Sequence, residues 1–505
     1  MSAPTASQKP PTKGWNTRDA LADMEEGYAV IMDNWFPGTE KITLRRGSAE
    51  HVTGLGASVE TLMNYTAISG TEALFGVADG DIYNVTTSGA VGAAVSTGYS
   101  SSRFQYVNIG TSGGQFLFAV NGADAPISWN GSVWANPSLT AAGFTAANVV
   151  WCNLHQNRLW VGMKQSLDAW YLPVKSISGT VVVFPLASVA QMGGYIMAMG
   201  TWTRDGGDGT DDVAVFLTSQ GEAILYQGTD PSDATKWALI GVFRVGKPIG
   251  RRCMIKAGAD LIMVTQDGFV SATAILSLDR SQSQRVALSA QINPSVNQAV
   301  SDAGSTFGWQ PLLYPKAAML LFNIPTSVSG TYHQFVFNTL TGAPARFTGM
   351  DALCWGMLGD NAYFGAADGT VYLFDSGASD NGAAIEGDVL PAFSAFRSPS
   401  IDKRFGMVEP IFQGEGNPNA ALDLNVDYQI AAPTGVSAAS PVNSARWGVS
   451  KWGIGVWGSA LQIFRGRRGV RGIGRTASLR IRVSSTTSRP SLIETRYWFT
   501  PAQTR

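Results

Sequence analysis

The chain has 505 residues, 14% of them charged, with 57 glycines, 15 tryptophans and a formal net charge of -1. This length allows two or three domains. Because the net charge is close to zero, the overall composition is not that of a protein that binds polyanions. Cys152, Cys253 and Cys354 are widely spaced and odd in number, which favours a reducing site of synthesis over a disulfide scaffold. No apolar stretch follows Met1, and none approaches about 18 residues, so we expect neither a secretion signal nor a membrane span.

The N-terminal part begins with residues 1–13, rich in Ser, Pro, Thr and Lys, which predict a tail that orders only against a partner. A short helix is predicted next, because apolar side chains recur at i, i+3, i+4 and i+7, the spacing of one helix face. They are Tyr28, Ile31, Met32 and Trp35, and Pro37-Gly38 ends the run. Residues 41–46 then alternate as a strand does, with Ile42 and Leu44 on one face.

Hairpins recur through the middle of the chain. Residues 363–375 predict two apolar strands joined at Asp368-Gly369, and residues 75–83 repeat six of nine positions around Asp79-Gly80. Weaker versions occupy residues 116–134, 215–226 and 261–270. Because these units recur about every 40 to 50 residues, we predict an all-β fold whose main part is an irregular β-propeller of roughly six to eight blades.

We place this propeller at residues 51–378, with a helical insertion near 279–303 in which Pro294 suits the first helical turn. Val296, Ala299, Val300 and Ala303 are expected to face inward. Residues 1–50 form an N-terminal arm and docking segment in this scheme.

The C-terminal part, residues 388–505, predicts a small β-sandwich. Residues 376–387 are rich in Ser, Gly, Ala and Asn, as expected of a domain boundary. Strict alternation predicts strands at 422–430 and 479–483, and residues 493–499 form the closing strand. Facing strands of this kind would pair Asp423 or Asp427 with Arg480 or Arg482.

A basic block follows residue 464. The region contains ten arginines and a single carboxylate residue, Glu494. Five lie in a Gly-rich run, namely Arg465, Arg467, Arg468, Arg471 and Arg475, and the others are Arg480, Arg482, Arg489, Arg496 and Arg505. Three interpretations stay open: a solvated loop with a charged strand face, contact with the phosphates of passing DNA, and docking to an acidic partner.

Trp447, Trp452 and Trp457 recur every five residues, each followed by Gly. Since this step matches neither helix nor strand, it predicts an irregular loop that presents large apolar groups. The three rings would pack under the loop, lie in a subunit interface, or stack on a sugar.

Residues 206–213 fit a single calcium-binding nonapeptide, which makes Asp205, Asp208 and Asp211 weak candidate metal ligands. That motif binds metal between consecutive copies and this chain has one, so an acidic hairpin loop is the favoured interpretation. We expect no metal and no cofactor.

Enzyme motifs are absent from the sequence. His51, His155 and His333 are far apart, and His155 is best interpreted as a strand end. There is no GxSxG, HExxH or P-loop. We predict that the protein is not an enzyme, although distant carboxylates that meet in the fold would leave a glycosidase pair open.

Residues 28–38, which include Asp33-Asn34-Trp35-Phe36-Pro37-Gly38, and the following Leu44-Arg45-Arg46-Gly47 resemble the N-terminal segment of tail nozzle proteins of short-tailed bacteriophages. These proteins are also described as packaged-DNA stabilisation or tail tubular proteins. Two later segments are similar to the same family: residues 248–268, with Arg251-Arg252, and Ile292-Asn293-Pro294.

The resemblance implies a structural virion protein of the tail, assembled in the bacterial cytoplasm. It implies a homo-oligomeric ring, expected to be a hexamer, that extends the DNA channel below the portal and helps retain and then pass the genome. Implied partners are the tail adaptor (head-to-tail connector), a distal needle, plug, fibre or spike, and double-stranded DNA bound without sequence specificity. Because symmetric copies of lumen-facing arginines would grip the DNA, docking to protein is favoured for most of the basic block.

Docking to another subunit or to the adaptor is expected near residues 14–47 and 440–475. The candidate residues are Tyr28, Trp35, Phe36, Trp447, Trp452 and Trp457. The alternatives are a propeller-type receptor- or glycan-binding tail protein and a polysaccharide-degrading propeller enzyme.

Overall fold

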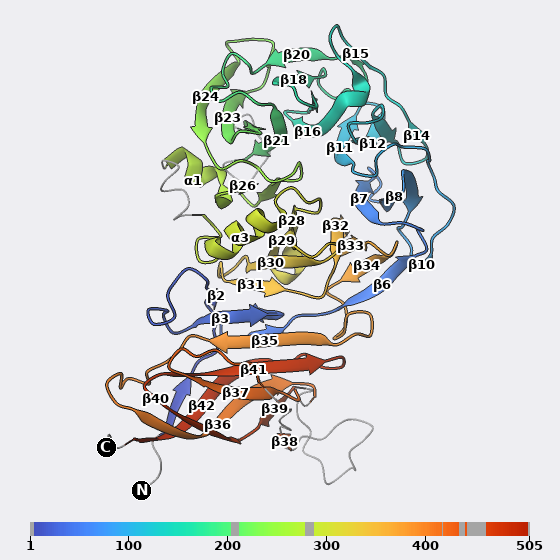
Figure 1. The fold of residues 1–505 in the computed structure, drawn as a ribbon. Coiled ribbons are helices and arrows are strands. Elements are labelled where there is room, and N and C mark those ends of the chain that lie inside the picture. Colours follow the sequence, from blue (N-terminus) through green and yellow to red (C-terminus); the bar gives the residue numbers. More distant parts are fainter. Residues whose placement is uncertain are drawn as a thin grey trace. The chain divides into compact units, whose positions relative to one another are not determined.

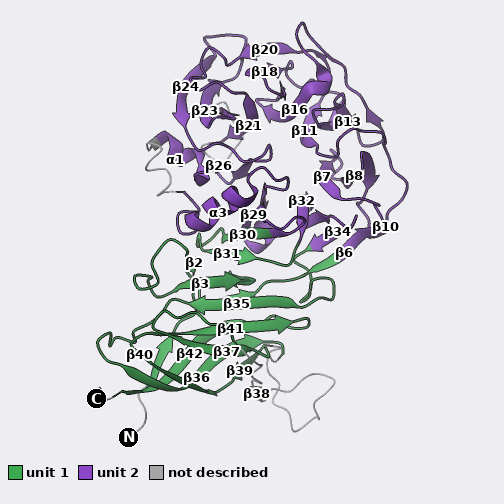
Figure 2. Cartoon of the chain, viewed as in Figure 1, with its two compact units in different colours: residues 1–49, 333–350, 374–505 green, residues 50–332, 351–373 purple. Residues whose placement is uncertain are grey.

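The computed structural model describes residues 5–203, 212–277, 287–416, 418–433, 440–441 and 461–502. The protein is mainly β (Figure 1) and forms two compact units (Figure 2). Unit 1 comprises residues 1–49, 333–350 and 374–505, and unit 2 comprises residues 50–332 and 351–373. Unit 1 therefore joins N-terminal and C-terminal segments that the sequence analysis treats as separate parts. No helix in the described part of the chain is long and apolar enough to cross a membrane.

Unit 2 contains, in its described residues, seven successive groups of paired antiparallel strands. The groups are β7 (Val59–Thr66), β8 (Glu72–Ala78) and β9 (Asp81–Asn84); β11 (Gln105–Thr111), β12 (Gly114–Val120), β13 (Ile127–Trp129) and β14 (Trp134–Ala135); β16 (Val149–His155), β17 (Arg158–Met163), β18 (Asp168–Tyr171) and β20 (Val182–Pro185); β21 (Ile196–Trp202), β22 (Val213–Thr218), β23 (Glu222–Gly228) and β24 (Trp237–Arg244); β25 (Met254–Ala257), β26 (Asp260–Thr265) and β27 (Gly268–Ser271); β28 (Gln310–Tyr314) and β29 (Met319–Pro325); and β32 (Ala352–Leu358), β33 (Asn361–Ala366) and β34 (Val371–Phe374).

The first strands of these groups form a closed circle. In order, β7, β11, β16, β21, β25, β28 and β32 each contact the next, and β32 returns to β7. Figure 1 shows the groups following one another around unit 2. At the closure, β6 (Ser48–Thr53) pairs with β34, and β10 (Gly89–Ala90) pairs with β6. The last group is thus completed by a strand that precedes the first group in the sequence.

Apolar side chains fill the spaces between neighbouring groups. Between β16–β18 and β21–β24, Trp160 stacks on Trp237 with ring centroids 5.7 Å apart and meets the edge of Phe216 at 5.6 Å. All residues of β22 are buried. Because such strands are covered on both faces, their sequences are apolar runs rather than alternating patterns.

The predicted hairpins are confirmed, and their turns differ. Asp79 and Gly80, with φ of 49° and 76°, form the two-residue turn between Ala78 and Asp81. At the second copy of this sequence the turn is longer, and Asp368 accepts a hydrogen bond from the Thr370 N–H at 2.9 Å. The weaker repeats are the hairpins β12–β13–β14, β22–β23 and β26–β27.

The insertion contains helix α3 (Asn293–Ala303), with Pro294 in its first turn, and the unpredicted helix α1 (Ala272–Ser277) precedes it. Val296 and Ala303 of α3 are buried, and Ala299 and Val300 are half-buried. Short pieces elsewhere in unit 2 are the pair β15 (Leu139–Thr140) and β19 (Gly179–Thr180), and the 3-10 turns η1 (Ala146–Asn148) and η2 (Pro315–Ala317).

Unit 1 contains two sheets. One has the order β38 (Ser440–Pro441), β39 (Gln462–Arg465), β36 (Lys403–Gly414), β42 (Ser491–Pro501), β5 (Ile42–Leu44) and β4 (Trp35–Pro37), with β1 (Thr5–Gln8) on β42 and β40 (Arg468–Gly474) on β36. The other has, within unit 1, the order β30 (Tyr332–Asn338), β31 (Pro344–Phe347), β3 (Tyr28–Asp33), β35 (Ile385–Pro391), β41 (Ala477–Ser485) and β37 (Ala421–Val426), with β2 (Gly14–Trp15) on β3.

The two sheets of unit 1 pack on each other through Tyr497, which is fully buried. Its hydroxyl, on β42, accepts the Leu479 N–H of β41 at 3.2 Å and donates to Gln8 Oε1 at 2.7 Å. The predicted strands around Ile42, Leu479 and residue 493 are confirmed as β5, β41 and β42.

Two local predictions in unit 1 are wrong. The predicted helix at residues 28–35 is instead the strands β3 and β4, separated by Asn34 at φ 61°. Pairing of β3 with β35, more than 350 positions away, decides this structure against the helical spacing. The strand expected at 422–430 ends at Val426, because Asp427 and Tyr428 turn the chain at φ of 45° and 65°.

Candidate functional site

The predicted docking residues of the N-terminal segment separate into two kinds. Trp35 has no exposed surface and lies against Gly387, so it belongs to the core of unit 1 and is not a docking residue. Tyr28 and Phe36 are partly exposed. Trp447, Trp452 and Trp457 lie outside the described residues, as do the candidate metal ligands Asp205, Asp208 and Asp211. In the described part of the chain, no group of three or more His, Cys, Asp or Glu side chains is placed to hold a metal.

Arg45 forms the centre of a buried network in unit 1 that the sequence analysis missed. Its guanidinium, 1% exposed, pairs with Asp380 at 2.5 Å and donates to Asn34 Oδ1 at 2.8 Å and to the Thr348 carbonyl at 2.9 Å. Asn34 in turn donates to the Glu386 carbonyl at 2.8 Å. The network joins segments that are more than 300 positions apart, which local sequence patterns do not reveal.

Three arginines of the basic block pair with two carboxylates that precede the block in the sequence. Asp388 on β35 pairs with Arg480 at 2.6 Å and with Arg482 at 2.7 Å, and Asp402 pairs with Arg475 at 3.2 Å. The β37–β41 register does place Asp423 opposite Arg480, as predicted, but the ion pairs form with Asp388.

Four residues, three on the adjacent strands β36 and β42 and one in the connection between β39 and β40, form a second charged cluster. Arg467 donates to Glu409 at 2.9 Å, and Arg496 lies 3.8 Å from Glu409 and 3.1 Å from Glu494. The Glu409 side chain is only 4% exposed because these arginines cover it. Arg467 also lies over the ring of Trp498, 5.2 Å from its centroid.

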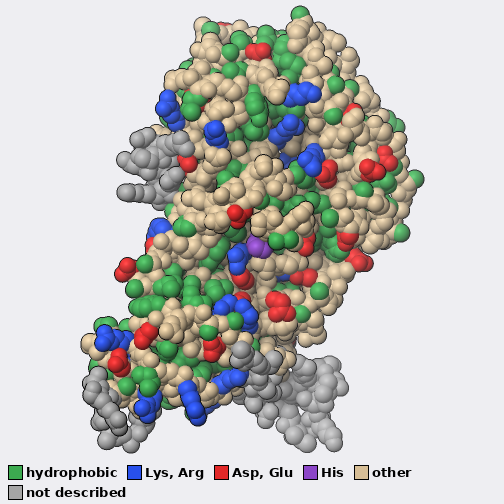
Figure 3. Space-filling view, in the orientation of Figure 1, with side chains coloured by type: hydrophobic (Ala, Val, Ile, Leu, Met, Phe, Trp, Pro, Cys, Tyr) green, Lys and Arg blue, Asp and Glu red, His purple; other side chains and the backbone are tan. Residues whose placement is uncertain are grey.

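The surface around this cluster is both basic and apolar, and we call it the basic face. It consists of Arg404, Met407, Ile463, Arg465, Arg467, Arg471, Ile473, Arg496 and Trp498. Met407, Ile463 and Ile473 are 36%, 40% and 55% exposed. Figure 3 shows blue and green side chains interspersed over the part of unit 1 that holds β36, β40 and β42. Exposed apolar groups beside arginines are typical of protein interfaces.

The other basic-block residues are distributed differently. Arg468 is half-buried and its Nη1 has no hydrogen-bond partner, and Arg489 donates to the Leu44 carbonyl at 3.2 Å. Arg505 lies outside the described residues. The block is therefore part structural and part exposed, and only the exposed part can meet a partner.

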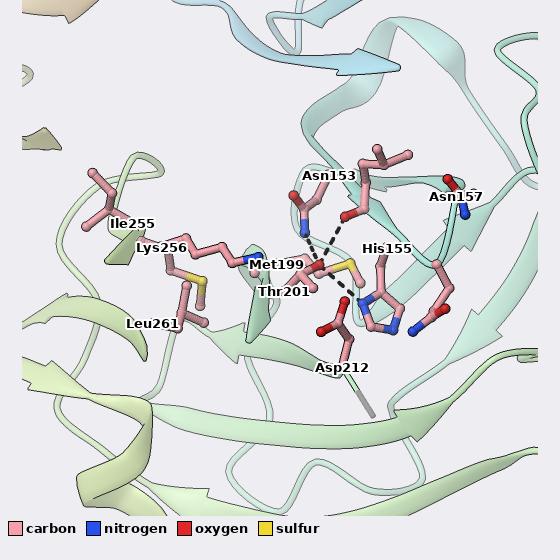
Figure 4. A pocket seen from close by; sticks show the side chains of 13 residues that line it. Asn153, His155, Asn157, Met199, Thr201, Asp212, Ile255, Lys256 and Leu261 are labelled. Carbon is pink, nitrogen blue, oxygen red and sulfur yellow. Dashed lines mark hydrogen bonds between the residues drawn. The ribbon is translucent and has the colours of Figure 1, made fainter. Parts of the chain in front are cut away.

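A cavity of about 510 Å³ in unit 2 lies at the end of β16, where His155 ends the strand as predicted. Figure 4 shows Asn153, Thr201 and His155 joined by hydrogen bonds, with Asp212 beside them in this view. Thr201 donates its hydroxyl hydrogen to the Leu154 carbonyl at 3.0 Å, so His155 Nδ1, 3.2 Å away, must be the donor to Thr201 Oγ1. This arrangement leaves His155 Nε2 as a buried acceptor that has no hydrogen-bond partner among the described residues.

Burial lowers the pKa of His155 to about 4. At neutral pH the ring is therefore uncharged and poorly suited to exchange protons with a substrate. Among the described residues that line the cavity, Asp212 is the single carboxylate, whereas glycoside hydrolysis ordinarily uses two.

The same shift predicts a pH dependence of stability. Between pH 6.5 and about 4 the unfolded chain binds a proton at His155 that the folded chain does not, so the free energy of unfolding falls as the pH falls. We expect a loss of at most about 3 kcal/mol across this range. Urea unfolding at several pH values should show a flatter pH profile for His155→Gln than for wild type. An unchanged slope in His155→Gln would refute the assignment.

Comparison with protein-family models gives no match, and comparison with curated proteins gives no significant one. Among solved structures, the chain is similar to the computationally designed Ika8 protein, at 12% identity and a TM-score of 0.39 over 65% of this chain and 100% of that one. It is also similar to BBS1N, solved in complex with ARL6DN, at 7% identity and a TM-score of 0.42 over 65% of this chain and 97% of that one. These scores are too low to assign a family or a function.

Proposed function

We propose that the protein is a structural virion protein, the subunit of a tail nozzle ring in a short-tailed bacteriophage. In this proposal unit 2 is an irregular β-propeller of seven blades, supported by the cyclic contacts of its seven inner strands within the described residues. Unit 1 is a β-sandwich-like body, supported by the two sheets that Tyr497 joins.

The observation that carries the proposal is the basic face. A chain with few charged residues exposes arginines and isoleucines together on one sheet of unit 1, where three apolar side chains are at least 36% exposed. Such a surface suits an acidic or mixed protein partner better than solvent. In a ring, each subunit meets its neighbours through two unlike surfaces, and a further surface meets the adaptor.

The residues that carry the resemblance to nozzle proteins support a structural role. Asn34 and Arg45, from the two N-terminal segments of the resemblance, share the buried network around Asp380. Arg252, from the third segment, is half-buried and hydrogen-bonded within unit 2. The proposed ring would hold packaged DNA without sequence specificity, and its partners would be the adaptor and a distal needle or plug.

Charge reversal on the edge strand β40 tests the docking role. Arg471 and Ile473 are exposed and Arg471 has no ion pair in the described residues, so Arg471→Glu combined with Ile473→Asp should leave the fold intact. We expect self-association or adaptor binding to weaken at least about tenfold, as loss of an interface arginine and an apolar contact would cause. Light scattering after size-exclusion chromatography measures the mass of the assembly, and the Arg244→Glu variant, at an exposed position of unit 2, is the control. Assembly identical to wild type would remove this face from the interface.

A further inference from the structure

A second cavity of unit 2, about 290 Å³ in volume, lies among the inner strands of the circle. Residues from β7, β11, β16, β21, β25 and β28, and from the segment that leads into β25, line it. The lining includes Thr61, Phe104, Asn153, Arg251, Arg252 and Gln310. Consecutive arginines thus reach a cavity that six inner strands line.

Arg252 forms the wall of this cavity. Its Nη2 donates to the Glu60 carbonyl at 3.2 Å, to Thr61 Oγ1 at 2.7 Å and to the Phe104 carbonyl at 3.0 Å. Its Nη1 donates to Gln310 Oε1 at 3.2 Å. All these acceptors are neutral, and none of the described residues forms an ion pair with Arg252. Burial accordingly lowers the pKa of Arg252.

Arg251 lies at the same cavity and is exposed to it. Its Nη1 comes within 3.5 Å of the position that a Cβ atom on Gly122 would occupy. In the described part of the chain Arg251 has neither an ion pair nor a hydrogen bond. Partial burial and the positive charge of Arg103 both lower the pKa of Arg251.

The balance of charge here is positive. Arg103 is already paired with Glu60 at 2.9 Å and lies over the ring of Phe307, 4.3 Å from its centroid. The remaining guanidiniums, on Arg251 and Arg252, form no ion pair among the described residues, and the Glu60 charge acts on Arg252 without a direct contact between the two side chains' charged groups. A partly desolvated pair of cations gains free energy from an anion, since charge-assisted hydrogen bonds are stronger than neutral ones.

We propose that this cavity binds a small oxyanion bearing a phosphate or carboxylate group, with Arg251 as its direct ligand and Arg252 as the fixed charge behind it. The site is independent of the nozzle role, because it lies within unit 2 and needs no second subunit. A free inorganic ion and the anionic group of a small metabolite present the same chemistry to Arg251.

Calorimetric titration of the full chain tests this site. Inorganic phosphate and, separately, citrate are titrated at constant ionic strength into wild type, Arg251→Gln and Arg244→Gln. We expect saturable binding of at least one anion by wild type and by Arg244→Gln, and at least a tenfold weaker affinity in Arg251→Gln. A preference for phosphate or citrate would identify the source of the anion. Either the absence of saturable binding in wild type or equal affinity in Arg251→Gln would overturn the proposal.

Discussion

Replacing Arg45 by alanine is expected to lower the free energy of unfolding of unit 1 by about 3–5 kcal/mol, because the buried charge of Asp380 is left without its partner. Asp380 would lose its ion pair, and Asn34 and the Thr348 carbonyl would lose a donor. Urea unfolding, with hydrogen exchange in peptides from residues 28–49 and 374–391, would locate the effect in this unit.

The neighbouring residue provides a matched control. Arg46 carries the same side chain and is exposed, so Arg46→Ala should change the stability by less than about 0.5 kcal/mol. Equal stability of the two variants would show that the Arg45 network does not hold these segments together.

The second large effect is expected from Arg252→Ala, which should destabilise unit 2 by about 3 kcal/mol or more. The guanidinium joins residues of β7, β28 and the approach to β11, and Gln310 extends the network to Trp355 of β32 through two hydrogen bonds. Its removal leaves the carbonyl groups of Glu60 and Phe104 without this donor. Chemical denaturation followed by circular dichroism measures the loss.

Arg251→Ala is the matched control for this change, since Arg251 has no hydrogen bond in the described residues. We expect it to unfold within about 1 kcal/mol of wild type. If Arg252→Ala were no less stable than Arg251→Ala, the closed circle of inner strands would not depend on this side chain.

Local sequence patterns predicted the hairpins well, because a turn and its two strands lie within about a dozen residues. The turn at Asp79-Gly80 is an example. The same pattern at Asp368-Gly369 gave a hairpin with a longer turn, since the Asp368 carboxylate bonds to the Thr370 N–H and to the Tyr372 hydroxyl. A two-residue motif does not reveal such hydrogen bonds between a side chain and the turn, and so it does not predict the length of the turn.

Pairing between segments that are far apart in the sequence explains the predictions that were wrong. Residues 28–35 have helical spacing, yet β3 pairs with β35, and the strand partner outweighs local periodicity. The basic block seemed nearly free of counter-charges because Asp388, Asp402 and Glu409 precede it by tens of residues. Both the buried and the exposed arginines of the chain could be assigned only once the sheets were in place.

The N-terminal and β25 segments that resemble nozzle proteins share one physical feature. Each supplies an arginine, Arg45 or Arg252, whose guanidinium is hydrogen-bonded to several separate segments. Such residues stabilise the unit that contains them.

The mass of the purified particle, from light scattering after size-exclusion chromatography, tests the nozzle proposal most directly. The proposal predicts a closed assembly of six subunits at micromolar concentration. A particle of one subunit across the whole concentration range would contradict it.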